Sequence, residues 1–165
     1  MAYITDSQQI WVYYWEEMWK WWNVQRLSKK ECAKLLKWAC RLYNVPAPSL
    51  KLHRPLPGKR WATAFDPSDY SITLSPQHMN EAVCLHEVAH AIHSLLTGDE
   101  AHEAHGPEWL ALYIYLLDRL GLAPRIALFA TAKVWRLKWK DLDKHNPLRI
   151  RKTYARLRRK EKLDT

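Results

Sequence analysis

The stretch HEVAHAIHSLLTGDEAHEAHGPEW, residues 86–109, contains five histidines and four glutamates. Ser75-Pro76 before it and Gly98 within it are helix start and stop signals, so its first half is expected to be helical. His86 and His90 belong to an H-E-x-x-H pattern, and on a helix two such residues lie on one face, about 6 Å apart along the axis. Two imidazoles at that spacing can bind one zinc ion. The stretch therefore predicts a metal-binding helix.

A catalytic zinc needs a third protein ligand and an open fourth position. His93 shares the helix face of His86 but lies about 10 Å further along the axis, so we expect it at the rim of the site. The chain is expected to reverse after Gly98, which leaves the candidates His102, Glu103, His105 and Glu108. His105 is favoured because Gly106-Pro107 begins the next helix directly after it. A carboxylate at Glu108 is already explained by the helix dipole.

The N-terminal part of the chain predicts two helices. Over residues 6–23, Trp11, Trp15, Trp19 and Trp22 recur on one helix face, and we expect this stripe to be buried core. A capping box formed by Ser28 and Glu31 begins a second helix, which should end near Asn44.

The middle of the chain, residues 50–74, predicts three short strands, because KLHR, WATAF and YSITL are separated by turn signals. Helices are expected again from Ser75-Pro76, from Gly106-Pro107 to Gly121, and from Ala123-Pro124. KVWRLKWK, residues 133–140, is expected to be a strand or the end of that last helix, and a basic helical segment should follow from Asn146-Pro147. The fold class is therefore α+β, with a small three-stranded sheet packed on a helix-rich body.

The composition predicts one domain over residues 1–132, in which a Trp-rich helical part (1–48) precedes a metal-binding core (49–132). No signal peptide or membrane-spanning run is recognisable, so a cytoplasmic protein without a membrane partner is expected. The three cysteines form no C-x-x-C pair and are expected to be reduced core residues: Cys32, Cys40 and Cys84.

The net charge of +9 lies entirely in a basic C-terminal extension, residues 133–165, which contains 13 Lys and Arg but only four Asp and Glu. Such a concentration of charge favours a polyanion partner, and DNA is the partner we expect, although a solvated amphipathic helix would account for the charge equally well. Tryptophans would stack bases while cations neutralise phosphates. The candidate residues are Trp135, Arg136, Lys138, Trp139, Lys140, Arg149, Arg151, Lys152, Arg156, Arg158 and Arg159.

HEVAHAI followed by HGPEW resembles the SprT-like (Spartan-type) zinc metallopeptidases, and YSITLSP resembles the strand and connection before that family's metal helix. The resemblance covers about residues 50–132. It implies a zincin-like metallopeptidase core, Zn²⁺ bound by His86, His90 and His105, and Glu87 as the general base. The family's cysteine-rich zinc ribbon is absent after this core, and the Trp-rich N-terminus has no counterpart in the resemblance.

The chemistry expected of these residues is hydrolysis of a peptide bond in a protein or peptide substrate, with DNA-associated proteins as one candidate class. Zinc activates water and Glu87 accepts its proton. An edge strand within residues 61–74 could hold an extended substrate. Tyr113, Tyr115 and His93 are candidates for stabilising the oxyanion. The alternatives are a nucleic-acid-binding protein with a structural or vestigial zinc site, or a metal-dependent hydrolase with a non-peptide substrate.

Overall fold

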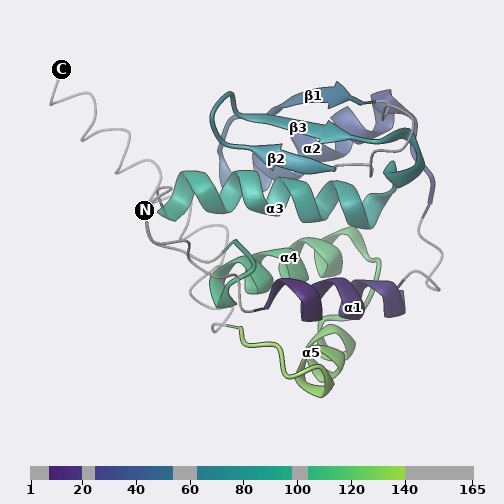
Figure 1. Ribbon diagram of the computed structural model, residues 1–165, viewed down its shortest axis with the longest axis vertical. Coiled ribbons are helices and arrows are strands. Elements are labelled where there is room, and N and C mark those ends of the chain that lie inside the picture. Colours follow the sequence, from purple (N-terminus) through teal and green to yellow (C-terminus); the bar gives the residue numbers. More distant parts are fainter. Residues whose placement is uncertain (1–7, 20–24, 54–62, 98–103, 140–165) are drawn as a thin grey trace, which may run out of the picture.

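The computed structural model describes residues 8–19, 25–53, 63–97 and 104–139, and it confirms a mixed α+β fold (Figure 1). The described residues form five α-helices and one three-stranded sheet. The helices are α1 (Gln9–Trp19), α2 (Lys29–Tyr43), α3 (Glu81–Thr97), α4 (Pro107–Leu120) and α5 (Arg125–Val134). The strands are β1 (Ser49–Leu52), β2 (Ala64–Asp66) and β3 (Ser71–Leu74).

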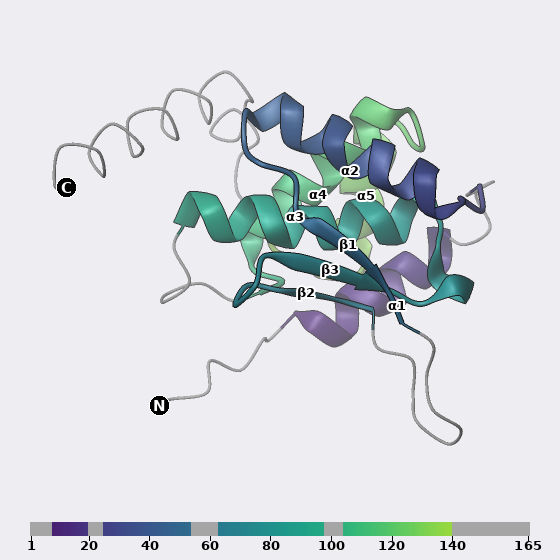
Figure 2. The same ribbon diagram turned by 90° about the horizontal axis from the view of Figure 1, so that it is seen from above.

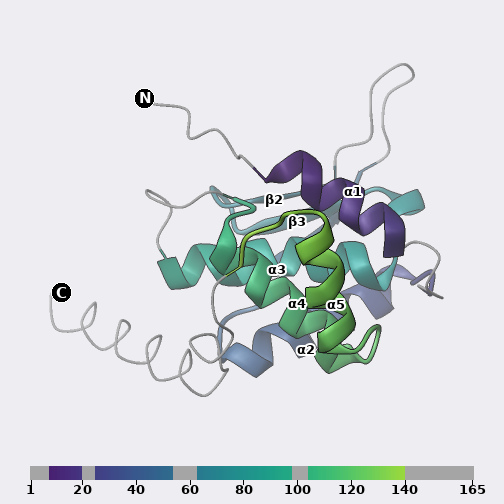
Figure 3. The ribbon, with the colours of Figure 1, turned by 90° about the horizontal axis from the view of Figure 1, so that it is seen from below.

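Helix α3 lies at the centre of the molecule, with the sheet and α2 on one side and α4, α1 and α5 on the other (Figure 1). The strand order is β1-β3-β2, with β1 parallel and β2 antiparallel to β3. Among the described strands, β2 is therefore an edge, and it contacts α3. Views from above and below both place α1 on the side of α3 where β2 lies (Figures 2 and 3).

Both ends of two expected helices, α2 and α4, are confirmed by their capping geometry. Ser28 and Glu31 form the capping box of α2, and Asn44 ends that helix in the left-handed conformation. Gly106 caps α4 before Pro107, and Gly121 ends it with φ of 79°. A positive φ is strained for residues that have a Cβ atom, and this explains why position 121 is a glycine.

The expected helix start at Ser75-Pro76 is wrong. Residues Pro76–His78 form only a short 3-10 turn, and α3 begins at Glu81. The Leu27 N–H donates to the Met79 carbonyl at 2.9 Å, which holds this part of the chain in a short bridge instead of a helix. The Asn80 side chain then accepts a hydrogen bond from the Val83 N–H at 2.9 Å and serves as a new N-terminal cap.

The tryptophan stripe of α1 is buried only in part. Trp15 is fully buried, as expected, but Trp11 is 48% exposed, so its assignment to the core is wrong. The buried face of α1 instead follows Gln8, Val12 and Trp15, and Trp11 packs beside Trp135 on the outer side. The side chains of Trp19 and Trp22 lie outside the described residues.

Replacing Trp15 with Ala should lower the free energy of unfolding by about 3 to 5 kcal/mol, because a fully buried indole is removed. The change also breaks the hydrogen bond from Trp15 Nε1 to Thr131 Oγ1, 2.9 Å, which joins α1 to α5. Urea unfolding measures the effect. Trp11→Ala is the matched control and should cost far less, so equal losses for the two variants would contradict this account of the core.

Residues 133–140 are expected to be a strand or the end of the helix, and this holds only in part, because Lys133 and Val134 end α5 while residues 135–139 form neither helix nor strand. Helix α5 ends at Val134, and Arg136 turns the chain with φ of 57°. Leu137 is then buried, and the Gln8 side chain bonds both the N–H and the carbonyl of Lys138. The start of the basic segment thus packs on the domain, whereas the helix expected from Asn146-Pro147 lies outside the described residues.

All three cysteines are buried and free of disulfides. Among the helices that the structure describes, none combines the length and apolar character needed to cross a bilayer.

Candidate metal centre

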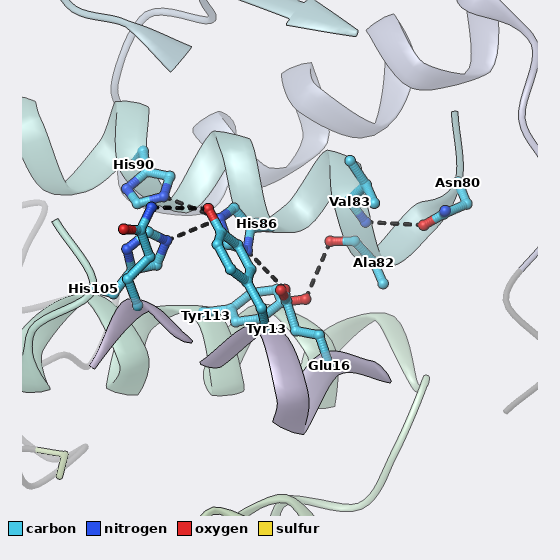
Figure 4. Close-up of polar contacts among 10 residues, drawn as sticks. Tyr13, Glu16, Asn80, Ala82, Val83, His86, His90, His105 and Tyr113 are labelled. Atoms are coloured by element: carbon cyan, nitrogen blue, oxygen red, sulfur yellow. Dashed lines mark hydrogen bonds and ion pairs between the residues drawn. The ribbon is translucent and has the colours of Figure 1, made fainter. Parts of the chain in front are cut away.

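Three histidines converge between the middle of α3 and the start of α4 (Figure 4). His86 and His90 are one turn apart on α3, and His105 directly precedes α4. The His86 Nε2 atom lies 3.1 Å from His90 Nε2 and 3.2 Å from His105 Nε2. Nitrogens bound at 2.0–2.1 Å to a tetrahedral zinc ion are about 3.3 Å apart. Two of the three nitrogen–nitrogen distances are close to this value, and the three ligand atoms all lie within 4.8 Å of one another, so they could hold one metal ion.

The connection into α4 fixes the position of His105. Gly106 caps the helix and Pro107 occupies its first position, so the backbone directly after the histidine is constrained. The Gln8 side chain donates a hydrogen bond to the His105 carbonyl at 2.9 Å, and both residues are buried. A loop residue is thus held at the metal site from two sides.

The other ligand candidates are not brought into this group. Glu108 lies in the first turn of α4, as the helix dipole favours, and is not part of the described ligand cluster. His93 is buried and lines a cavity beside the cluster, but it is not a member of it either. His102 and Glu103 lie outside the described residues.

Helix α1 supplies a carboxylate that the sequence did not reveal. Glu16 Oε1 lies 2.7 Å from His86 Nδ1, and the two side chains are largely buried (Figure 4). This contact fixes the proton on Nδ1, so that Nε2 of the neutral ring presents its lone pair to the metal position. The Tyr113 hydroxyl contacts the Glu16 carboxylate and also donates a hydrogen bond to the Ala82 carbonyl at 3.2 Å. Glu16 therefore orients His86.

Two aromatic rings hold the imidazoles in place. Trp109, fully buried on α4, stacks on His90 with ring centroids 4.8 Å apart and meets His86 and His105 edge-on at 4.8 and 4.7 Å. Tyr13 of α1 stacks on His86 at 6.0 Å and meets His105 at 5.6 Å. The ligand cluster is thus packed from α4 on one side and from α1 on the other.

Glu87 lies beside the ligands on α3 and is buried. Burial raises the pKa of its carboxyl, while the neighbouring His86 side chain and a hydrogen bond from the Phe65 backbone N–H oppose the rise. Burial also holds the pKa of His90 well below its usual value, and the nearby imidazoles of His86, His105 and His93 act in the same direction. His90 is therefore neutral at pH 7, as a metal ligand must be.

Two cavities meet at these residues. The smaller, about 340 Å³, lies between α1 and β2 over the histidine cluster, and its lining includes Phe65, His90 and His105. The larger, about 610 Å³, extends towards the start of α3 and the connection between α4 and α5. Tyr13, Thr63, His86 and Glu87 line both. The metal position and the general-base candidate therefore face open space.

Tyr113 and Tyr115, two of the candidates for stabilising the oxyanion, make contacts elsewhere in the fold. The Tyr113 hydroxyl is bound to the Ala82 carbonyl, and burial raises its pKa so that it stays protonated. Tyr115 packs edge-on against Tyr43 at 6.1 Å and lines neither cavity.

The residues expected to contact DNA are described only in part. Trp135 stacks on Tyr14 at 6.1 Å and Trp139 packs on Phe129 at 5.2 Å, so both rings contact the domain and are half-buried. Arg136 and Lys138 are exposed. The DNA contact stays a prediction, and its remaining residues lie outside the described part: Lys140, Arg149, Arg151, Lys152, Arg156, Arg158 and Arg159.

Replacing Glu16 with Ala should weaken zinc binding about 10- to 100-fold, because His86 loses the group that orients its ring. Competition with a chromophoric chelator measures the affinity. Glu16→Gln should recover most of it, since the amide oxygen still accepts the Nδ1 proton, and Glu17→Ala on the same helix is the matched control. Equal affinity for wild type and Glu16→Ala would show that the contact does not position the ligand.

Function has to be inferred from this geometry. Comparisons with protein-family models, with curated proteins and with solved structures each find no match to the chain.

Proposed function

We propose that the protein is a zinc-dependent endopeptidase of the SprT-like type, with a zincin-like core. The observation that carries the proposal is the convergence of three imidazole Nε2 atoms beside a buried glutamate, at the edge of a cavity. The H-E-x-x-H and H-G-P-E-W segments that resemble this class supply these same side chains.

The ligand set supports zinc as the metal and catalysis as its role. Neutral imidazole nitrogens are common zinc ligands, and the distances from His86 Nε2 to the His90 and His105 nitrogens are close to those expected around a tetrahedral ion. Structural zinc sites are closed by four protein ligands, whereas catalytic sites use three and leave one position open. The described cluster has three ligands and adjoins a cavity, which favours a catalytic site.

The mechanism follows from the groups around the metal position. Bound zinc would supply a Lewis acid that lowers the pKa of a coordinated water and polarises the carbonyl of the substrate. Glu87 accepts the proton of the attacking water and then delivers it to the amine that leaves. The Phe65 N–H orients the Glu87 carboxylate. The raised pKa of Glu87 makes this carboxylate a better proton acceptor than an exposed glutamate. Glu16 keeps His86 in the tautomer that can bind the metal.

Strand β2 offers a binding site for an extended substrate. Its outer side is not paired with any described strand, and Ala64 and Phe65 line the cavity above the histidines. A peptide added to this edge would form backbone hydrogen bonds, which are largely independent of sequence. Its scissile bond would then lie over Glu87 and the metal position.

Removing zinc tests the proposal directly. The purified protein should contain about one zinc per chain and should cleave an unfolded protein such as casein. Dialysis against a chelator should remove both the metal and the cleavage, and added zinc should restore them. A metal-loaded protein that leaves a panel of unfolded proteins intact would contradict a peptidase. Cleavage that persists in zinc-free protein would contradict the metal mechanism.

A further inference from the structure

Tyr13 of α1 lies over the histidine cluster. Its ring stacks on His86 with an interplanar angle of 19° and meets His105 edge-on at 69°. Figure 4 shows the Tyr13 hydroxyl directed towards the side of the cluster where His90 and His105 lie. The resemblance to SprT-like peptidases starts only at about residue 50, so it assigns no role to this side chain.

Packing alone does not explain a tyrosine at this position. Tyr13 is 46% exposed, whereas Trp109, which contacts the same imidazoles from α4, is fully buried. A phenyl ring would make the same stacking contacts with His86 and His105, so the hydroxyl needs an explanation of its own. Since Tyr13 lines both cavities, the side chain that carries this hydroxyl borders the space that a substrate would occupy.

A neighbour on α1 orients the hydroxyl. Gln9, one helical turn earlier, donates a hydrogen bond from Nε2 to the Tyr13 hydroxyl oxygen at 3.1 Å, and Gln9 also lines the smaller cavity. Because the Tyr13 oxygen accepts this hydrogen bond, the proton of the hydroxyl is the part of the group that can be donated to a substrate.

The other three residues that line both cavities have different roles. Two of them are the ligand candidate His86 and the general-base candidate Glu87. The third is Thr63, whose hydroxyl lies 3.3 Å from His78 Nδ1 and accepts a backbone hydrogen bond at 3.3 Å. Within this group of four residues, Tyr13 is therefore the best placed to donate a hydrogen bond to the substrate.

We propose that the Tyr13 hydroxyl donates a hydrogen bond to the carbonyl oxygen of the scissile bond and stabilises the negative charge that develops there. This inference rests on the proposed function. A donor that is fixed in place before the reaction, at the atom where charge develops, is often the largest single contribution to catalysis.

The proposed step keeps Tyr13 neutral throughout. As the water oxygen bonds to the carbonyl carbon, a proton passes to Glu87 and the π electron pair of the carbonyl moves to the oxygen that faces Tyr13. When the C–N bond breaks, this electron pair returns to form a carbonyl again, and the departing amine takes the proton from Glu87. Tyr13 stabilises the charge through its hydrogen bond and retains its own proton.

Replacing Tyr13 with Phe tests this role, because the change keeps the ring and removes only the hydroxyl. We expect kcat for peptide cleavage to fall by about 100- to 1,000-fold with KM nearly unchanged, since the hydrogen bond strengthens only as charge develops. Tyr14→Phe is the matched control, because Tyr14 is the next residue on α1, is 51% exposed and lines neither cavity. A kcat for Tyr13→Phe within about threefold of wild type would overturn the assignment.

Inhibitor binding gives a readout that does not depend on turnover. In a phosphinic peptide, a tetrahedral phosphinate replaces the scissile amide and carries a permanent negative charge. Tyr13→Phe should weaken its binding to zinc-loaded protein by at least about tenfold in calorimetry. The ordinary amide peptide should bind Glu87→Gln protein, which cannot turn it over, equally well with and without the Tyr13 hydroxyl. Equal weakening of both ligands would overturn a role in stabilising the oxyanion.

Zinc affinity and stability separate this role from support of His86. Chelator competition and urea unfolding should give the same zinc affinity and the same unfolding midpoint for Tyr13→Phe and wild type, because the stacked ring remains. A loss of zinc affinity large enough to explain the loss of activity would overturn contact with the substrate.

The same set of variants separates failure of this inference from failure of the proposed function. If zinc-loaded wild type cleaves no peptide, the peptidase and the role of Tyr13 are both overturned. If Glu87→Gln abolishes cleavage while Tyr13→Phe does not, only the role of Tyr13 is overturned. A fall in kcat for His93→Ala in place of Tyr13→Phe would assign the oxyanion to His93, which also lines the smaller cavity.

Discussion

Replacing Glu87 with Gln is expected to lower kcat for peptide cleavage by a factor of at least about 100, because general acid–base catalysis typically supplies a factor of 100 to 10,000. The amide is nearly isosteric with the carboxylate but cannot accept the proton of the attacking water. Since Glu87 lies beside the ligand cluster without being a member of it, zinc content should be unchanged.

The measurement compares wild type, Glu87→Gln and Glu81→Gln in the same zinc-loaded state. Glu81 lies in the first turn of α3 and lines neither cavity, so it is a control for the same substitution on the same helix. Stability provides a second readout. In zinc-free protein, burial raises the pKa of Glu87, so its ionised form is destabilising in the folded state and the neutral amide should leave the midpoint of unfolding unchanged or raised. Activity within about tenfold of wild type would contradict the general-base role.

The ligands could be predicted from the sequence because their geometry is local. The spacing of His86 and His90 follows from the helix period alone, and Gly106-Pro107 indicates a helix start next to His105. The structure brings these three side chains together. The same kind of local signal predicted the capping box of α2 and the glycine end of α4.

The contributions of α1 could not be predicted in this way. Glu16 is 70 residues from His86 in sequence, and only the packing of α1 beside α3 brings the carboxylate to the imidazole. Helical spacing showed that α1 has two faces but not how wide the buried one is. This limit explains why Trp11 was wrongly assigned to the core. Its helical spacing from Trp15 is that of a buried stripe, but its ring instead packs with Tyr14 and Trp135 in an exposed aromatic patch.

Replacing His105 with Ala is expected to lower zinc affinity by more than about 100-fold, which is beyond the 10- to 100-fold effect of losing an orienting partner. His86 and His90 alone would leave the ion with two protein ligands, fewer than either structural or catalytic zinc sites use. The substitution should preserve the fold, because Gln8 bonds the backbone carbonyl of residue 105, which the variant retains.

Metal analysis and chelator competition measure the loss, and thermal unfolding provides an independent readout. A ligand that binds only the folded state raises the midpoint of unfolding, so added zinc should stabilise wild type and leave His105→Ala unchanged. His102→Ala and His93→Ala are the matched controls, since each removes an imidazole without removing a member of the described cluster. If His102→Ala empties the site while His105→Ala remains zinc-loaded, the third ligand has been assigned to the wrong residue. The three ligands determine which side of the metal is open to substrate. That result would therefore also contradict the proposed binding of the substrate along the edge of β2.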